Sequence, residues 1–204
     1  MGGITWIIVD ALKGKKISGI GFCTGAISGL IGITPASGYV PPWAAIVIGA
    51  VTAICCNFAA GIKYIIAVDD SLDAFSLHGI GGIVGKIMTG ILAQKRIALL
   101  DGTIFNGGII DGYPMQLVYQ LISIAAISAY SFMGTLIILA IINCIPGMHI
   151  RASAFEEIKG GDLAQLGEQA HDWIAESHDF SPEHSRVISD IDVRNPKQVY
   201  PSNE

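Results

Sequence analysis

Four long apolar segments constrain the fold of this 204-residue chain more than any other feature of its sequence. They cover residues 17–34, 43–68, 72–93 and 117–145. A helix needs about 20 mainly apolar residues to cross a bilayer, and each segment reaches or approaches that length. Only 14% of the residues are charged, against about a quarter in a typical soluble domain. The sequence therefore predicts an all-α, polytopic membrane helix bundle.

The charges divide the chain into an apolar part and an acidic tail. Residues 1–146 carry seven Lys and Arg against six Asp and Glu, a net charge of +1. Residues 147–204 carry five against eleven, a net charge of −6, and we expect them to be largely disordered after about residue 178. Residues 2–9 are typical of the end of a further membrane span. The acidic tail argues against nucleic-acid binding, which needs basic patches.

The positions of Lys and Arg predict how the bundle is oriented. The basic loop at 13–16 and Lys63 fall on one side of the four segments, together with the tail. Lys95 and Arg96 fall on the other side. Because cytoplasmic loops carry the excess of Lys and Arg, we expect the tail to be cytoplasmic.

Glycines recur four residues apart in two of the apolar segments. Gly21, Gly25 and Gly29 lie in the first, and Gly81 and Gly85 lie in the third. Positions without a side chain let helix backbones approach closely in a membrane, so this spacing predicts a tight bundle. The alternative is that glycine is simply common in membrane helices.

His78 lies within the third apolar segment. A polar, titratable group at bilayer depth is costly unless it faces a cavity, a partner or a substrate path. One interpretation is a pore-lining imidazole that hydrogen-bonds a small substrate or passes a proton. The other is a histidine that hydrogen-bonds a neighbouring helix and so holds the bundle together.

Two charged residues flank His78 in the same segment. Asp73, five residues earlier, is expected in the first helical turn, where a carboxylate complements the helix dipole. Alternatively, it stabilises a cationic substrate from a distance. Five α-helical residues rotate the chain by about 140°, so Asp73 should not pair directly with His78. Residues 69–71 (Asp-Asp-Ser) offer helix N-caps. Lys86 has no carboxylate at an obviously matching depth, and the sequence offers no account of it.

Signatures of enzymes and of bound cofactors are missing from the sequence. It contains no phosphate-binding loop, dinucleotide fingerprint, nucleophile elbow or metal-ligand spacing. We therefore expect no enzyme, no cofactor and no metal site. The histidines at 171, 178 and 184 lie in a polar segment and are interpreted as solvated.

The residues around His78 resemble a known family. The string DDSLDAFSLHGIGGIVG at 69–85 is similar to the tenth transmembrane helix of ammonium transporters, the Amt/Mep/Rh superfamily. The resemblance covers about residues 1–175 and leans towards fungal ammonium permeases. The other segments that carry it are 25–40, 39–43 and 56–58 and, at the start of the cytoplasmic tail, 147–151, 160–162 and 167–168.

This resemblance implies a fold and an assembly. Ammonium transporters of this family have eleven transmembrane helices, in two inverted five-helix repeats and a long last helix, and form homotrimers with one pore per subunit. The chain corresponds to the end of the seventh helix, the helices up to the eleventh, and the tail. We therefore expect an N-terminally truncated transporter, with a partial transmembrane domain at 1–146 and a cytoplasmic tail at 147–204.

The resemblance also implies site residues. His78 matches the second histidine of the twin-histidine pair in the family's pore, Asp73 a carboxylate near the cytoplasmic pore mouth, and Ala74 a pore-lining position. The sequence departs from the family pattern at four positions. These are Ser76 for a glycine, Lys86 for an uncharged residue, and Leu166 and His171 in the tail, which put tail-mediated subunit coupling in doubt.

The implied function is transmembrane transport of ammonium or ammonia across the plasma membrane by a channel-type permease. Two alternatives stay open. The chain could be a non-transporting fragment or pseudogene product that associates with full-length subunits, because inverted-repeat transporters place their path between two halves. It could also sense ammonium through its tail.

Overall fold

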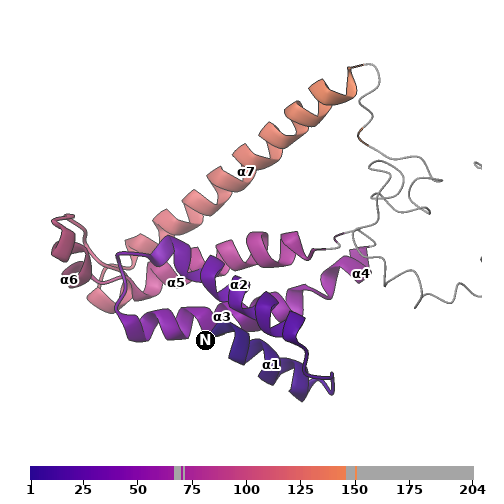
Figure 1. Cartoon of the computed structure of the whole chain (residues 1–204). Coiled ribbons are helices and arrows are strands. Elements are labelled where there is room, and N and C mark those ends of the chain that lie inside the picture. Colours follow the sequence, from indigo (N-terminus) through magenta and orange to yellow (C-terminus); the bar gives the residue numbers. More distant parts are fainter. Residues whose placement is uncertain (67–69, 71, 146–149, 151–204) are drawn as a thin grey trace, which may run out of the picture. The chain divides into compact units, whose positions relative to one another are not determined.

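The computed structural model describes residues 1–66, 70, 72–145 and 150. The chain divides into two units, Met1–Phe132 and Met133–Glu204, and each is considered by itself. Every regular element in the described part is helical (Figure 1), which confirms the predicted all-α class. The helices are α1 (Gly2–Leu12), α2 (Gly19–Ile33), α3 (Pro42–Ala59), α4 (Ile62–Ile66), a π-helical segment (Phe75–Ile80), α5 (Gly81–Leu92), α6 (Lys95–Ala98) and α7 (Met115–Asn143).

Four of these helical stretches are long and apolar enough to cross a membrane. They are Gly19–Ala36, Pro42–Ala59, Phe75–Leu92 and Met115–Asn143, so the four predicted spans are confirmed. The second span is shorter than predicted, because the helix stops at Ala59 and a turn at Ala60 and Gly61 separates it from α4, which carries Lys63. The third begins at Phe75 rather than at residue 72.

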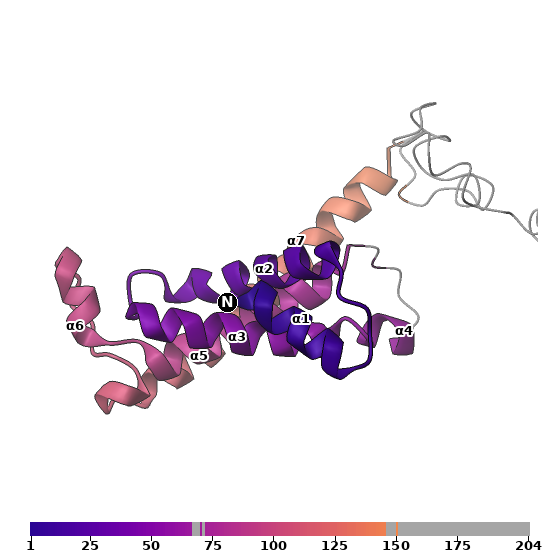
Figure 2. The same ribbon diagram turned by 60° about the horizontal axis from the view of Figure 1, so that its bottom comes forward.

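The predicted close packing of glycines is present in the first unit. α1, α2 and α3 pack against one another, and α5 packs against α2 and α3 (Figure 2). A Cβ added at Gly25 of α2 would fall on the Cβ of Trp6 and lie 2.9 Å from the carbonyl oxygen of Gly2, both in α1. A Cβ added at Gly85 of α5 would fall on the carbonyl oxygen of Gly32 in α2. These glycines thus bring three backbones into direct contact.

The connection between α5 and α7 is an ordered loop, as its turn residues suggest. The Gln94 amide donates to the Tyr39 carbonyl oxygen at 2.8 Å, and the Lys95 amide donates to Asp111 Oδ2 at 2.5 Å. The rings of Tyr39 and Phe105 meet edge to face, with centroids 5.1 Å apart. The loop is therefore tied both to itself and to the segment that follows α2.

The second unit contains, among the described residues, the last part of α7 and Ile150. The tail at 151–204 lies outside the described residues. So do the expected disorder after about residue 178, the solvated histidines, and the departures at Leu166 and His171. These statements stay predictions.

Candidate functional site

His78 lies in a helical segment that is not α-helical. Phe75–Ile80 is a π-helix, which continues without interruption into α5. Ser76 and Leu77 are buried, whereas the His78 side chain is exposed. Single π-helical turns are rare and frequently occur at functional sites, where the extra residue in the turn redirects side chains. Hydrophobic patterning does not distinguish this turn from an α-helix, so the sequence analysis missed it.

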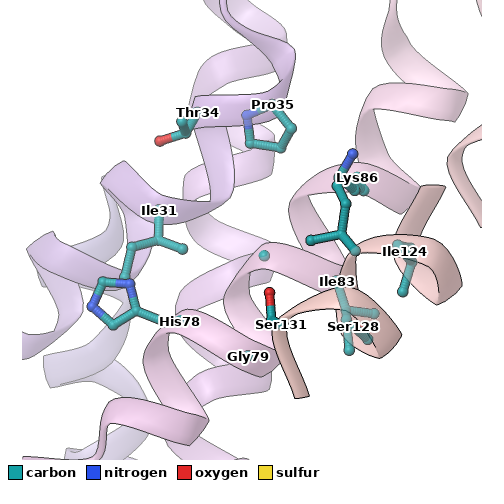
Figure 3. Close-up of a pocket in the computed structure, with 12 residues that line it drawn as sticks. Ile31, Thr34, Pro35, His78, Gly79, Ile83, Lys86, Ile124, Ser128 and Ser131 are labelled. Carbon is teal, nitrogen blue, oxygen red and sulfur yellow. The ribbon is translucent and has the colours of Figure 1, made fainter. Parts of the chain in front are cut away.

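The His78 side chain faces a cavity of about 730 Å³ within the first unit (Figure 3). Its walls come from α2, the 3₁₀ turn that follows it (Thr34–Ala36), the π-helical segment, α5 and the middle of α7. The walls are mainly apolar, and four isoleucines contribute to them. The polar and charged lining residues are Thr34, His78, Lys86, Ser128 and Ser131. An apolar cavity with a few polar groups is typical of a small-ligand site.

Within the described part of the chain, the His78 imidazole is not held in place by a hydrogen bond. No side-chain hydrogen bond joins it to any of the residues that the structure describes. The alternative interpretation, in which His78 hydrogen-bonds a neighbouring helix, thus finds no bonding partner among these residues. Gly82, one turn further along α5, also lines the cavity, and a Cβ there would meet no atom within 4 Å. The space beside the imidazole is therefore open.

Lys86 lines the same cavity and has a partner that the sequence analysis did not find. Its Nζ donates to Ser123 Oγ in α7 at 2.7 Å, and its side chain is half-buried. The expected kind of partner was a carboxylate at a matching depth, whereas the partner is a neutral hydroxyl 37 residues away. Ser123, Ser128 and Ser131 all lie on α7. The recurrence of these serines at intervals of five and three residues was the one weak sign in the sequence that α7 presents hydroxyls to this cavity.

The structure corrects the predicted role of Asp73. This residue precedes the helix in a left-handed backbone conformation, with φ of 54°, and does not lie in the first turn. Its carboxylate instead forms an ion pair with Lys63 Nζ at 2.8 Å, and the side chains of Asp73 and Lys63 are 27% and 19% exposed. Asp73 and the exposed Ala74 do not line the His78 cavity. The structure thus does not bring the three predicted site residues to one place.

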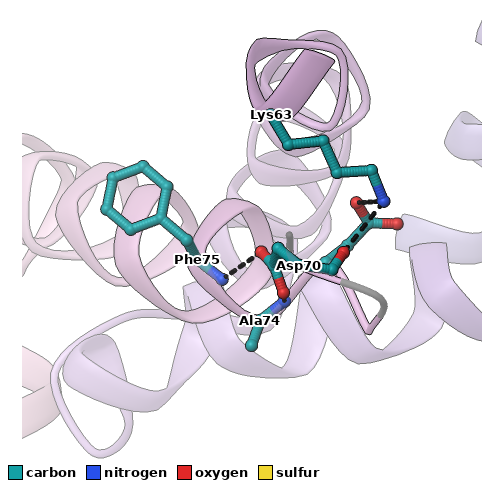
Figure 4. Close-up of polar contacts among 5 residues, drawn as sticks. Lys63, Asp70, Ala74 and Phe75 are labelled. Carbon is teal, nitrogen blue, oxygen red and sulfur yellow. Dashed lines mark hydrogen bonds and ion pairs between the residues drawn. The ribbon is translucent and has the colours of Figure 1, made fainter. Parts of the chain in front are cut away.

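Asp70, rather than Asp73, bonds the amides at the start of the helix, although it lies before that helix. Its Oδ1 accepts from the Ala74 amide at 2.8 Å and its Oδ2 from the Phe75 amide at 3.0 Å (Figure 4). Both amides would otherwise lack partners, because the first turn of a helix has no preceding carbonyls. The N-cap residue of the π-helical segment is Ala74, which makes no side-chain cap hydrogen bond, so the N-cap predicted within 69–71 is not found at Asp70. Residues 69 and 71 lie outside the described part.

We expect Asp70→Ala to loosen the start of the His78 helix. Losing a carboxylate cap costs about 1 kcal/mol, so the amides of Ala74 and Phe75 should exchange hydrogen roughly fivefold faster through local opening. Hydrogen–deuterium exchange by mass spectrometry measures this directly. Asp101→Ala, which removes a carboxylate bonded to the Thr103 amide in the loop, is the control and should leave the exchange of Ala74 and Phe75 unchanged. Equal exchange in the Asp70 variant and the native chain would contradict the prediction.

Comparison with known proteins decides the family of this chain. The sequence profile of the Ammonium Transporter Family matches residues 1–171. The chain belongs to this family. The match confirms the resemblance that the residues around His78 indicated. With four helices long and apolar enough to cross a bilayer, the chain is an integral membrane protein.

Fungal relatives are among the most similar proteins. Ammonium transporter 1 of Schizosaccharomyces pombe is 46% identical over 184 residues, which are 89% of this chain and 37% of the relative. Ammonium transporter MEP2 of Saccharomyces cerevisiae is 42% identical over 186 residues, with coverages of 89% and 37%. The crystal structure of Candida albicans Mep2 superimposes with a TM-score of 0.72 at 47% identity, covering 81% of this chain and 37% of that one. The chain therefore spans just over a third of the length of these ammonium transporters.

The family also agrees with the expectation that the chain is not an enzyme, since these relatives are transporters. In the part of the chain that the structure describes, no three His, Cys, Asp or Glu side chains are grouped so that they could hold a metal ion.

Proposed function

We propose that this chain forms part of a pathway that conducts ammonium across a membrane, and that the cavity beside His78 is a section of that pathway. The observation that carries the proposal is an exposed imidazole, without a hydrogen-bond partner among the described residues, on an apolar cavity of about 730 Å³. Polar groups at bilayer depth are costly and usually functional. Relatives named ammonium transporters, at 42–46% identity, support the choice of substrate.

The chemistry of the cavity suits this substrate. A neutral imidazole accepts a hydrogen bond at one ring nitrogen and donates one at the other, so it can hold either an amine or its protonated form. Isoleucine side chains leave little to replace the hydration of an ion, which penalises larger or more strongly hydrated cations. In this proposal His78 replaces part of the water that the substrate leaves behind.

Asp73 and Ala74 belong to the same proposal as residues of the pathway entrance. Asp73 lies just before the helix that carries His78, and its negative charge is shared with Lys63. A carboxylate there would favour an approaching cation through a longer-range field. Ala74, the next residue, is exposed and presents a small side chain at the start of that helix.

We further propose the cellular setting that the family implies: a homotrimer in the plasma membrane with the tail in the cytoplasm. The orientation is supported by the basic residues of the 13–16 loop and Lys63, which lie at the same end of the bundle. Lys13 Nζ donates to Asn57 Oδ1 at 2.5 Å, which brings the 13–16 loop to the end of α3, close in sequence to Lys63. Cytoplasmic ends are the ones enriched in Lys and Arg.

The test is uptake of radiolabelled methylammonium by cells that lack their own ammonium transporters. One strain expresses this chain alone, and a second expresses it joined behind the preceding part of Candida albicans Mep2. The control expresses that preceding part without this chain. We expect uptake well above the control from the joined protein. No uptake above the control from either the joined protein or the chain alone, at normal protein levels in the membrane, would overturn the proposal and favour a non-transporting chain.

A further inference from the structure

Lys86 is a single fixed charge in an otherwise uncharged set of membrane helices. The four candidate spans, Gly19–Ala36, Pro42–Ala59, Phe75–Leu92 and Met115–Asn143, contain no other Lys or Arg and no Asp or Glu. A lysine near the end of a span can extend its stem to the membrane surface. Lys86 lies six residues before the end of its span at Leu92, and its Nζ is held by Ser123 Oγ of α7 rather than extended to the end of the helix.

The charge of Lys86 is not neutralised by the residues around it. Its contact within the described part of the chain is the hydrogen bond to Ser123 Oγ at 2.7 Å, and a hydroxyl carries no charge. The other polar groups that share its cavity are the hydroxyls of Thr34, Ser128 and Ser131 and the imidazole of His78. No carboxylate lines the cavity among the described residues. The positive field of the ammonium group therefore extends into the cavity.

Lys86 and His78 face one cavity from different sides (Figure 3). Eight residues separate them along one continuous helical stretch, which corresponds to roughly 12 Å of helix rise. Two unit charges at that separation in a protein interior change an equilibrium about tenfold at an effective dielectric constant of about 20. A cation beside His78 thus experiences a repulsion that an uncharged amine does not.

We propose that Lys86 is a specificity-determining residue, whose positive charge in the His78 cavity holds back cations and so favours passage of the uncharged amine. This inference rests on the proposed function, since it concerns what passes His78. The protonated amine gives its proton to water before entry, the uncharged amine passes the cavity, and it takes a proton from water on leaving. In the native protein little net charge then crosses with the substrate, about a tenth of what would cross without the Lys86 charge.

The rival explanation is that Lys86 only joins α5 to α7 through Ser123. It predicts that removing either partner has the same effect, because the hydrogen bond needs both. Our proposal predicts different effects, since Ser123→Ala leaves the charge in place while Lys86→Gln removes it. Glutamine also keeps a polar hydrogen-bond donor at this position, which limits the damage to folding. Lys86→Met is a second uncharged variant, and Lys86→Arg retains the charge.

The experiment measures methylammonium uptake and transport-associated current on the same membranes, in the form of the protein that takes up methylammonium in the test above. The quantity compared is current per molecule taken up. We expect Lys86→Gln and Lys86→Met to raise this ratio about tenfold, and Ser123→Ala and Lys86→Arg to leave it near the native value.

Failure of the proposed role of Lys86 and failure of the proposed function give different results. Native uptake with an unchanged ratio in both uncharged variants would overturn the role of Lys86 and leave the proposed function standing. An equal change in Ser123→Ala and Lys86→Gln would also overturn it, in favour of an interhelical contact. Absence of uptake by the native protein would overturn the proposed function and this inference together.

Discussion

We expect Gly85→Ala to prevent recovery of folded, monodisperse protein, whereas Gly82→Ala on the same helix should be tolerated. An added Cβ at Gly85 would fall on the carbonyl oxygen of Gly32 and lie 3.0 Å from the Cα of Gly32. Both are backbone atoms, so no side-chain rotation can relieve the contact. An added Cβ at Gly82 would meet no atom within 4 Å. The two variants add the same methyl group three residues apart, and they differ in what that group meets.

The magnitude follows from how α2 and α5 are held together. Overpacking a well-filled interior costs about 1–3 kcal/mol when side chains can adjust. Here the two backbones must separate, which would also disturb the neighbouring approach of Gly81 to Ile31 of α2, where an added Cβ lies 3.3 Å from Cγ2. We therefore expect a loss at or above the upper end of that range.

Size-exclusion chromatography of the detergent-solubilised protein, followed by thermal denaturation, measures the effect of the two substitutions. The expected result is a clear loss of the monodisperse peak for Gly85→Ala and a profile near that of the native chain for Gly82→Ala. Similar profiles and midpoints for the two variants would show that α2 and α5 do not pack through Gly32 and Gly85.

Most of the fold was predictable because it depends on patterns that the bilayer enforces. Apolar length predicted the four spans, and glycine spacing predicted that the helices pack closely, as Gly25 and Gly85 do. The end of the second span was predicted wrongly, because residues 60–68 continue the apolar composition past the turn at Ala60 and Gly61. Composition shows that such a stretch is apolar, but it does not show where the backbone hydrogen bonds of the helix stop.

The candidate site was less predictable, because it depends on local geometry and on contacts between distant residues. Helical spacing placed Asp73 in a first turn, whereas its positive φ puts it before the helix, and the helix-start amides bond Asp70 instead. The π-helical turn around His78 leaves no trace in the hydrophobic pattern. The contact between Lys86 and Ser123 joins residues 37 apart, and one sequence alone does not pair them.

The second large effect that we expect is a loss of methylammonium uptake in His78→Ala. In the proposed pathway the substrate leaves water and meets apolar walls, so the imidazole is a principal hydrogen-bonding partner. Leaving a buried polar group unpaired costs about 1–3 kcal/mol, which corresponds to roughly a five- to 150-fold loss of rate. We expect uptake to fall at least about tenfold, measured at equal amounts of protein in the membrane. Ser128→Ala, which removes a polar group from the same cavity, is the matched control and should have a smaller effect.

A second substitution separates the two roles that an imidazole can have. Asparagine at position 78 can donate and accept hydrogen bonds but cannot take up and release a proton near neutral pH. If His78 acts by hydrogen bonding, His78→Asn should retain much more uptake than His78→Ala. If it passes a proton, the two variants should be equally impaired. Native uptake in His78→Ala would contradict both roles, and the apolar cavity rather than the histidine would then be the element on which transport depends.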